Sequence, residues 1–324
     1  MKSFKVIVTL GPAVSDKKKL KSINECGECI YRLNGAHFEK KQAARSIEQL
    51  RDILPDAKIM LDLPGNKVRT VELSEPIRLI KGECFNLYDY QINYSLFYTH
   101  LKKGDIVRAN DSIFTLEVVE INKTTIKLLS HSEGILLSNK GLHVRGIHTD
   151  IPFLLERDHR LMDLVYSCSI DYLSLSFVRT ASDIREVKKI LNGQDVHIIA
   201  KIETQAAIDN LESILQEVES ILIDRGDLST DIDILKLAFI QEKVIEAGLK
   251  AGKDVYLATQ FLKNMETKPI PLISEIIDLC RTIRYGITGI QLSEETAVGK
   301  YPVECIKLVF DAFKNNVLIK DEKW

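Results

Sequence analysis

Short apolar segments alternate with segments of helical periodicity along most of this chain, and this alternation restricts the fold more than any other feature. The apolar segments are rich in β-branched residues, which favour strands. The predicted strands cover residues 5–10, 29–33, 57–61, 171–176, 196–203, 220–223, 254–258 and 288–292. Strands that alternate with helices form parallel sheets, because each helix returns the chain to the starting edge of the sheet.

The pattern changes between residues 72 and 148. Segments there are short and alternating, Gly, Asn and Asp separate them, and no helical period appears. This pattern predicts an all-β insertion after the third strand, which we interpret as a small β-barrel domain. The remaining segments, 1–71 and 149–316, supply eight strands that are each followed by a helix, and residues 317–324 form a short tail. Together they have close to the ~250 residues of a (β/α)8 TIM barrel.

An open, doubly wound sheet is the alternative α/β fold. Such a sheet usually carries a glycine-rich fingerprint after its first strand, and Gly11-Pro12-Ala13-Val14 does not match that fingerprint. The sequence also lacks a GxxxxGK[ST] phosphate-binding loop. We therefore predict a TIM barrel with an inserted β domain.

The composition excludes several classes of partner. The chain of 324 residues has 44 Lys and Arg against 46 Asp and Glu, and so lacks the basic excess of a nucleic-acid-binding protein. No apolar run approaches the ~18 residues of a membrane span, and the first residues do not form a signal peptide. Six cysteines without regular spacing are typical of reduced thiols. We predict a cytoplasmic protein that binds neither nucleic acid nor membrane.

Polar side chains collect at the carboxyl ends of the predicted strands. The strand over 196–203 ends in Lys201 and Glu203, which face the same side because they are two residues apart. The polar residues at the other strand ends are Thr9, Arg32, Asn34, Asp62, Ser174, Ser176, Arg225, Asp227, Thr259, Gln260, Ser293 and Glu295. One Lys–Glu pair alone is as easily explained as a structural ion pair. Cations and carboxylates on adjacent strands of a barrel instead predict a functional site at that face.

The residue types at these ends predict the chemistry. Glu203 and Asp227 follow consecutive strands, and two carboxylates with open positions suit Mg²⁺ or Mn²⁺. Lys201 and Arg32 supply positive charge for an anionic substrate. A helical turn beginning near Gly226 would offer free N–H groups to a carboxylate or phosphate. The set predicts a divalent-metal site for a phosphorylated or carboxylated small molecule, and it suits phosphoryl transfer and enolate chemistry alike.

A series of motifs runs in a fixed order from residue 4 to residue 313. They are Thr9-Leu10-Gly11-Pro12-Ala13, Arg32-Leu33-Asn34 with His37, Leu61-Asp62 with Gly65 and Val68-Arg69-Thr70, Lys140-Gly141, Ser176-Phe177-Val178-Arg179, Lys201-Ile202-Glu203, Arg225-Gly226-Asp227-Leu228, Ala258-Thr259-Gln260, Leu292-Ser293, and Glu295-Thr296-Ala297 with Gly299, Tyr301 and Pro302. With these motifs the chain resembles the pyruvate kinase family. The resemblance implies a (β/α)8 barrel, a small β domain that acts as its lid, and Mg²⁺-dependent phosphoryl transfer between phosphoenolpyruvate and ADP.

The resemblance also implies roles for individual residues. Glu203 and Asp227 match the metal ligands, and Lys201 matches the lysine that neutralises the transferring phosphoryl group. The implied catalytic residues are Lys201, Arg32, Thr259 and Lys67, with Thr259 near the substrate carboxylate and the enolate proton. The implied substrate-binding residues are Gly226, Asp227, Thr259, Ser176 and Arg69, and the implied nucleotide-binding residues are Arg32, Asn34, His37 and Lys140.

Two departures from the family pattern concern a monovalent cation. Ala36 stands where the family has a serine that helps to bind K⁺. Leu63 and Lys67 are the residue types of family members that need no K⁺, in which the lysine ammonium takes the place of the ion. The resemblance therefore implies that Mg²⁺ is required and K⁺ is not.

Other departures lie close to the implied site. Asp224 replaces an alanine, Ser229 and Glu294 replace glycines, and the lid hinge over residues 140–146 is rewritten. Asp224 and Glu294 add carboxylates near a site for anions. The chain ends at Trp324, soon after the last barrel helix, so we expect the family's C-terminal effector domain and its allosteric control to be absent. Association of identical chains through the barrel domain stays open.

Three functions remain open. The first is a pyruvate-kinase-like phosphotransferase acting on phosphoenolpyruvate and ADP or on a related enol phosphate, and the retained metal pair with Lys201 favours it. The second is a metal-dependent 2-keto-acid lyase or aldolase on the same barrel, for which lack of nucleotide binding would argue. The third is a catalytically silent binding or regulatory protein, which the altered loops favour and the intact metal ligands oppose.

Overall fold

Eight parallel strands form a closed barrel in the computed structural model, which describes residues 3–110 and 113–320 except for the side chains of residues 148 and 317–320. Around the barrel the strands follow the order β1-β15-β14-β13-β12-β11-β3-β2. Their bounds are β1 Lys5–Thr9, β2 Glu28–Asn34, β3 Lys58–Leu63, β11 Tyr172–Leu175, β12 His197–Ile202, β13 Ser220–Asp224, β14 Asp254–Ala258 and β15 Gly289–Leu292. The predicted TIM barrel is confirmed.

The barrel strands are mostly apolar between their ends, and both of their faces are buried. Along β1, Val6 and Val8 belong to the large core between the strands and the surrounding helices, whereas Ile7 belongs to a smaller core inside the barrel. Most of the other strands send one residue into this inner core in the same way, for example Met60 of β3 and Leu222 of β13. Parallel strands covered on both sides read as continuous hydrophobic runs for this reason.

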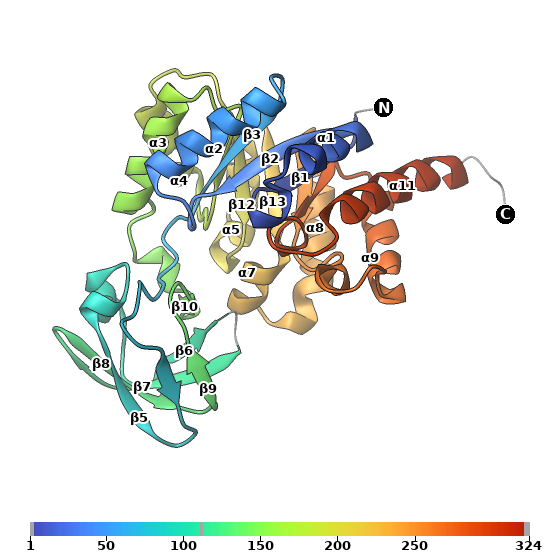
Figure 1. Cartoon of the computed structure of the whole chain (residues 1–324). Coiled ribbons are helices and arrows are strands. Elements are labelled where there is room, and N and C mark those ends of the chain that lie inside the picture. Colours follow the sequence, from blue (N-terminus) through green and yellow to red (C-terminus); the bar gives the residue numbers. More distant parts are fainter. Residues whose placement is uncertain (1–2, 111–112, 321–324) are drawn as a thin grey trace.

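Helices surround the barrel on its outside (Figure 1). They are α1 Lys17–Cys26, α2 Lys40–Ile53, α3 Glu156–Ser167, α4 Ala181–Leu191, α5 Gln205–Asp209, α6 Leu211–Glu217, α7 Arg225–Asp231, α8 Leu237–Lys250, α9 Ile273–Arg284, α10 Glu294–Ala297 and α11 Pro302–Lys320. Short 3-10 helices lie in the connections: η1 Pro12–Val14, η2 Asp89–Gln91, η3 Ser95–His100, η4 Ile147–Thr149, η5 Ile234–Lys236 and η6 Lys263–Glu266.

Two helical segments differ from the sequence-based expectation. The single helix expected between β12 and β13 is divided at Asn210, whose side-chain amide donates to the Ala206 carbonyl over 2.9 Å and ends α5. The last helix, α11, continues to Lys320 into the expected tail, since no Gly or Pro interrupts the chain there. Residues 321–324 of that tail, like residues 1–2 and 111–112, lie outside the described residues.

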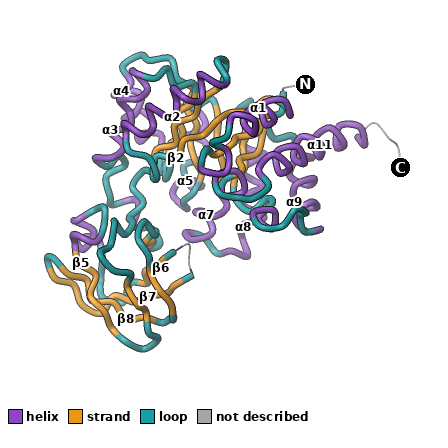
Figure 2. The backbone as a smooth tube through the Cα atoms, viewed as in Figure 1, coloured by secondary structure: helices purple, strands orange, loops and turns teal. Residues whose placement is uncertain are grey.

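The insertion after β3 is all-β, as predicted, and projects from one end of the barrel (Figure 1 and Figure 2). Its strands are β4 Ile77–Leu79, β5 Cys84–Tyr88, β6 Ile106–Ala109, β7 Phe114–Asn122, β8 Thr125–Ser130, β9 Gly134–Leu136 and β10 Leu142–His143. In the described part of the insertion these strands form a five-stranded sheet, β10-β6-β7-β8-β5, and a separate pair, β4-β9. The strands β4 and β9 have three residues each and pair only with one another in the described part of the chain.

The first and last parts of the described chain lie side by side. β1 is hydrogen-bonded to β2 on one edge and to β15 on the other, which closes the barrel. Phe4 stacks on Phe313 of α11 with ring centroids 4.5 Å apart, and its edge-to-face partner is Phe310 at 6.4 Å. No helix in the described ranges combines the length and apolar character that a membrane span needs.

Candidate active site

The carboxyl ends of the barrel strands surround a cavity of about 320 Å³ that also reaches the hinge of the insertion. Its lining residues are Arg32, Asn34, His37, Asp62, Lys67, Arg69, Asn139, Lys140, Gly141, Ser176, Phe177, Lys201, Asp224, Gly226, Asp227, Thr259, Gln260, Lys263, Ser293, Glu294 and Glu295. The structure therefore brings together every residue to which the resemblance gives a role except Glu203, which lies fully buried beneath the surface of this cavity. Of the other predicted strand-end residues, Thr9 and Ser174 do not line the cavity. Arg225, another predicted strand-end residue, is not in this lining set and instead bonds Asp278 on α9.

Lys201 lies at the centre of a buried ionic network. Its ammonium is 2.7 Å from Glu203 Oε1, 3.5 Å from Asp224 Oδ2 and 3.7 Å from Asp62 Oδ2. Burial by itself would lower the pKa of Lys201, but the three carboxylates raise it above its ordinary value. The side chain therefore stays cationic in a place that is almost closed to water.

Arg32 is fixed by Asp62. Its Nε donates to Asp62 Oδ2 over 2.7 Å, and a second nitrogen donates to the Thr9 hydroxyl over 2.9 Å. Burial favours the neutral form of Asp62, but Lys201 and Arg32 outweigh this effect and hold its pKa below the ordinary value. The guanidinium is thus oriented toward the cavity by one carboxylate, which leaves part of its donor fork for a ligand.

Glu203 combines burial with a strong local field. Its Oε2 accepts the backbone N–H of Phe177 over 2.7 Å, and its Oε1 faces Lys201. Burial raises the pKa of this carboxyl to about 8, Lys201 opposes the rise, and the nearby Asp227 and Asp224 add to it. A carboxyl held among other carboxylates gains most from a bound cation.

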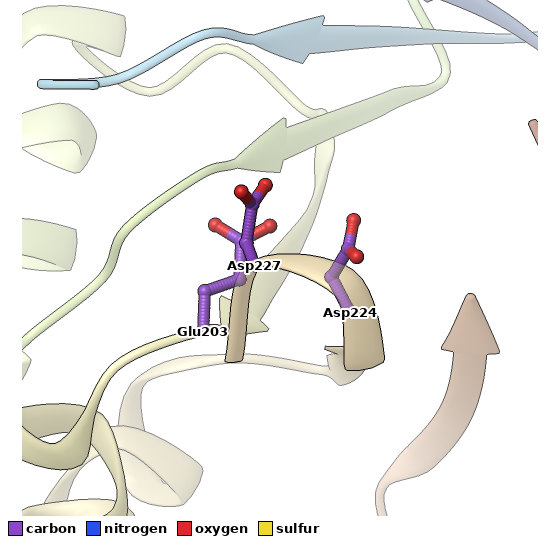
Figure 3. Close-up of side chains that lie close together, drawn as sticks. All are labelled: Glu203, Asp224 and Asp227. Atoms are coloured by element: carbon purple, nitrogen blue, oxygen red, sulfur yellow. The ribbon is translucent and has the colours of Figure 1, made fainter. Parts of the chain in front are cut away.

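Asp227 is paired with Lys67. α7 begins directly after β13, and Asp227 in its first turn forms an ion pair with the ammonium of Lys67, which comes from the loop after β3. Burial would raise the pKa of Asp227, but the cations, with Lys67 first, hold it well below its usual range. The predicted helical turn at Gly226 is confirmed, and it places Asp227 beside Glu203 (Figure 3).

The end of β14 carries an unusual backbone. Thr259 and Gln260 have φ angles of 76° and 57°, and Phe177 after β11 has a φ of 56°. Such angles are uncommon for residues with a Cβ and cost on the order of 1 kcal/mol each. At Phe177 the bend points the backbone N–H at Glu203, and Arg225 supports Thr259 by donating to its carbonyl over 3.1 Å. Three strained residues, which follow two different strands around one cavity, are typical of a functional site.

Three carboxylates could hold a divalent cation here. One oxygen each of Glu203, Asp224 and Asp227 lies within 4.8 Å of the others. Carboxylate oxygens are the ligands that Mg²⁺ and Mn²⁺ prefer, and the cationic side chains nearby prevent excessive negative charge. The donor set thus fits the metal that Glu203 and Asp227 predict, and it adds Asp224, which the sequence marked only as an unusual carboxylate.

The residues expected at a nucleotide line the cavity on the side of β2 and the insertion. Asn34 turns back to its own loop, where its Oδ1 accepts from the Ala36 N–H over 3.1 Å. The His37 side chain is exposed, and its partial loss of hydration beside the protein first, then Arg69 and Arg32, lower its pKa, so the ring is neutral near pH 7. Arg69 and Gly141 form an isolated β bridge, which places Lys140 and Arg69 together at the hinge.

The hinge is also tied to α7. His143 of β10 lies 3.2 Å from Asp231 at the end of α7, and the Gly146 N–H donates to the same carboxylate over 3.2 Å. This contact could not be predicted from the sequence, because His143 and Asp231 share no motif and are far apart in the chain. It connects the insertion to the helix that carries Asp227.

Asp62 and Asp224 are the functional candidates whose roles the sequence reasoning missed. Both stand at strand ends, so their position was visible, but their partners belong to other strands. Asp62 bonds a side chain of β2, and Asp224 accepts from Thr259 after β14. Only the order of the strands around the barrel reveals these pairs.

Comparison with known proteins gives a consistent result. The family model described as "Pyruvate kinase, barrel domain" matches residues 1–306. A pyruvate kinase of Thermococcus litoralis is 32% identical over 94% of this chain and 68% of its own length. Pyruvate kinases of Thermotoga maritima and Bacillus licheniformis are 30% and 31% identical over 95% of this chain, and it spans 70% and 56% of their lengths.

Proposed function

Because this chain belongs to the pyruvate kinase family, we propose that it is a Mg²⁺-dependent phosphotransferase that moves a phosphoryl group between a small enol phosphate and a nucleoside diphosphate. Phosphoenolpyruvate and ADP are the pair to test first. The observation that carries the proposal is that Lys201 and Asp227 line one cavity, while Glu203 lies directly beneath its surface and close to both. Phosphoryl transfer needs positioning and charge neutralisation more than covalent chemistry, and this site is equipped for both.

Each charged group has a place in this proposal. Lys201, kept cationic by its carboxylate neighbours, offsets the charge of the phosphoryl group in flight. A Mg²⁺ ion held by Glu203 and Asp227 would neutralise phosphoryl oxygens and help to align the two reactants. Arg32, oriented by Asp62, binds a phosphate with the donors that face the cavity.

The two ends of the cavity suit different ligands. We propose that Asn34, His37 and Lys140, with Arg32, face the nucleotide, since they lie toward β2 and the hinge. Ser176, Thr259 and Gly226 face the smaller substrate from the barrel, and Arg69 faces it from the hinge. Ser176 supports this role by accepting from Lys201 over 3.2 Å, which ties the substrate end to the central ammonium.

We further propose that the reaction does not depend on K⁺. The Lys67 ammonium is already bound to Asp227 within the cavity, so a fixed positive charge is part of the chain. Lys67 and Leu63 are the residues that differ from the usual family pattern, and the expectation that K⁺ is not required rests on them.

A coupled assay tests the proposed phosphotransfer. The wild-type chain should release pyruvate from phosphoenolpyruvate and ADP when Mg²⁺ is present, and Lys201→Ala should lose most of this rate, about 100-fold or more, because one oriented charge is removed from the transition state. Circular dichroism checks that the variant is folded. Equal background rates for wild type and variant would refute the proposal, and nucleotide binding measured by calorimetry would then separate a silent binding protein from a lyase.

We also propose that copies of the chain associate through the barrel domain. Large apolar side chains are exposed on neighbouring helices, with Phe239 of α8 69% exposed and Ile273 and Ile277 of α9 81% and 62% exposed. Exposed apolar patches of this kind mark interaction surfaces. Light scattering should give a dimer or larger species for the wild type and a monomer for the double variant Phe239→Glu, Ile273→Glu. A monomeric wild type would contradict the proposal.

A further inference from the structure

The carboxylate of Asp224 occupies the donors that a substrate carboxylate would need. The Thr259 hydroxyl donates to Asp224 Oδ1 over 2.6 Å. The Gly226 N–H is shared between this oxygen at 3.2 Å and the Thr259 hydroxyl oxygen at 3.1 Å. Thr259 and Gly226 are the two groups that sequence analysis assigned to a substrate carboxylate or phosphate. Their hydrogen bonds are instead made within the chain.

The position of Asp224 is held from several directions. It is the last residue of β13 and the N-cap of α7, so its backbone is fixed by a strand on one side and a helix on the other. Its side chain is only 11% exposed, and its second oxygen lies 3.5 Å from the Lys201 ammonium. The acceptor is therefore built into the wall of the cavity.

The donors are held as firmly as the acceptor. Thr259 keeps its left-handed backbone through the bonds from Arg225 to its carbonyl, and the Arg225 guanidinium stacks 4.0 Å from the Phe261 ring centre. The Thr259 hydroxyl can donate one hydrogen bond, and Asp224 accepts it. A second carboxylate entering here would find that donor used and a like charge in contact with it.

We propose that Asp224 is a specificity-determining residue that acts as an internal competitor for the carboxylate end of the substrate. The identity of the substrate in this inference rests on the proposed phosphotransferase function. The competition itself rests on the contacts of Asp224 with Thr259, Gly226 and Lys201. It follows that the wild-type site binds an enol phosphate with a free carboxylate more weakly than the same site would without Asp224, whereas the affinity for the same phosphate with an uncharged group at that position does not depend on Asp224.

Another role for Asp224 has to be separated from this one. Its carboxylate also lies within reach of Glu203 and Asp227, in the set of three that could hold a cation (Figure 3). As a metal ligand, Asp224 would raise metal affinity. As an internal competitor, it lowers the affinity for a carboxylate, and the two roles therefore predict opposite effects of its removal.

Binding of two matched ligands, without ADP and so without turnover, tests the inference. Phosphoenolpyruvate carries the carboxylate, and isopropenyl phosphate carries a methyl group in its place. Calorimetry in Mg²⁺ buffer should show that Asp224→Ala tightens the binding of phosphoenolpyruvate about tenfold or more relative to isopropenyl phosphate, because the Thr259 hydroxyl donor becomes available and a like charge is removed. Asp224→Asn keeps an acceptor oxygen for Thr259 but loses the charge, and should give a smaller change of the same sign.

Glu294→Ala is the matched control, since it removes one carboxylate from the exposed rim of the same cavity. It should leave the ratio of the two affinities within about twofold of the wild type, because a charge near water acts weakly and on both ligands. A melting curve shows that each variant is folded, and Asp224→Asn alone decides if Asp224→Ala does not fold.

The outcomes separate the readings. An unchanged ratio in the Asp224 variants overturns the inference. Weaker binding of Mn²⁺ together with weaker binding of phosphoenolpyruvate also overturns it and makes Asp224 a metal ligand. The ratio of the affinities for phosphoenolpyruvate and isopropenyl phosphate can shift as expected while the wild type gives no pyruvate in the coupled assay. In that case the proposed function fails and the specificity role of Asp224 stands.

Discussion

Several carboxylates around this cavity form ion pairs with buried cationic side chains. Asp62 holds Arg32 and lies 3.7 Å from Lys201, and neither of its neighbours has much access to water. Burying charges costs several kcal/mol per ion unless each one is paired, so the network is stable only as a complete set. Removal of a single member leaves an uncompensated charge behind.

Asp62→Asn should therefore lower the free energy of unfolding by about 3 kcal/mol, because Arg32 and Lys201 would remain buried beside a neutral amide. Urea unfolding measures the loss. Asp163→Ala is the control, since Asp163 pairs with Lys40 on the surface, where both side chains are about half exposed, and it should cost less than about 1 kcal/mol. Equal losses of unfolding free energy in Asp62→Asn and Asp163→Ala would contradict a stabilising role of the buried network.

The role of Lys67 can be tested by exchanging cations. The kcat/KM of the wild type should agree within about twofold in Na⁺ and K⁺ buffers, because the ammonium bound to Asp227 supplies the charge that an ion would supply. Lys67→Met should lose about tenfold or more, the equivalent of one charge-assisted contact. A wild-type rate in Na⁺ far below the rate in K⁺ would contradict the prediction.

The residue types at the strand ends were enough to predict the central residues of the candidate site. Lys201, Glu203 and Asp227 were found because they follow buried strands, and the barrel brings such ends together. The bond from Thr259 to Asp224 was not found, because it depends on the left-handed backbone at Thr259. Nothing in the residue type of a threonine predicts that conformation.

At the level of elements, the start of α3 supports the loop that carries Lys67. Asp158 in the first turn accepts the Leu155 N–H over 2.9 Å and, with its other oxygen, the Gly65 N–H over 3.0 Å. Gly65 has a φ of 63°, and its Cβ position is only 2.6 Å from the Ser176 carbonyl, so glycine is required there. Through this contact a helix on the outside of the barrel positions a loop at its mouth.

Burial raises the pKa of Asp158 to about 6, from an ordinary value of 3.8. The folded state therefore holds the proton more tightly than the unfolded state. The stability that Asp158 contributes is fully present below pH 3.8 and is lost as the pH rises through about 6.

Urea unfolding at pH 4.5 and pH 7.5 checks this sign. Relative to Asp158→Asn, which cannot titrate, the wild type should lose about 2 kcal/mol of unfolding free energy between the two conditions. The comparison uses the difference in pH dependence, so it is valid even if the variant is less stable at every pH. Parallel pH profiles for the two chains would contradict the raised pKa.

Over the whole molecule, the described residues form separate hydrophobic cores for the barrel and the insertion. The barrel core includes Ile23 and Leu292, whereas the insertion core includes Leu116 and Leu128, and the two clusters share no residue within the described ranges. The sequence predicted this division from the change of periodicity. It did not predict the division into two sheets, because pairing between short strands depends on which edges meet.

Leu116→Ala should destabilise the insertion by about 2–5 kcal/mol, since this leucine is fully buried in its core. Hydrogen exchange should accelerate at the amides of β7 and β8, while those of β12 in the barrel keep the wild-type rates. Acceleration in β12 to the same extent would show that the two cores unfold as one unit.

The closure of the barrel has a consequence for synthesis on the ribosome. β1 pairs with β2 early, but its other edge pairs with β15 near the end of the described chain. That edge exposes unpaired N–H and C=O groups until β15 has left the exit tunnel. The insertion needs no such delay, since its described strands, β4 to β10, pair only with one another and can fold while the rest is still being translated. The nascent chain thus carries a finished β domain on an open sheet, and an exposed β1 edge is where a chaperone would be needed most.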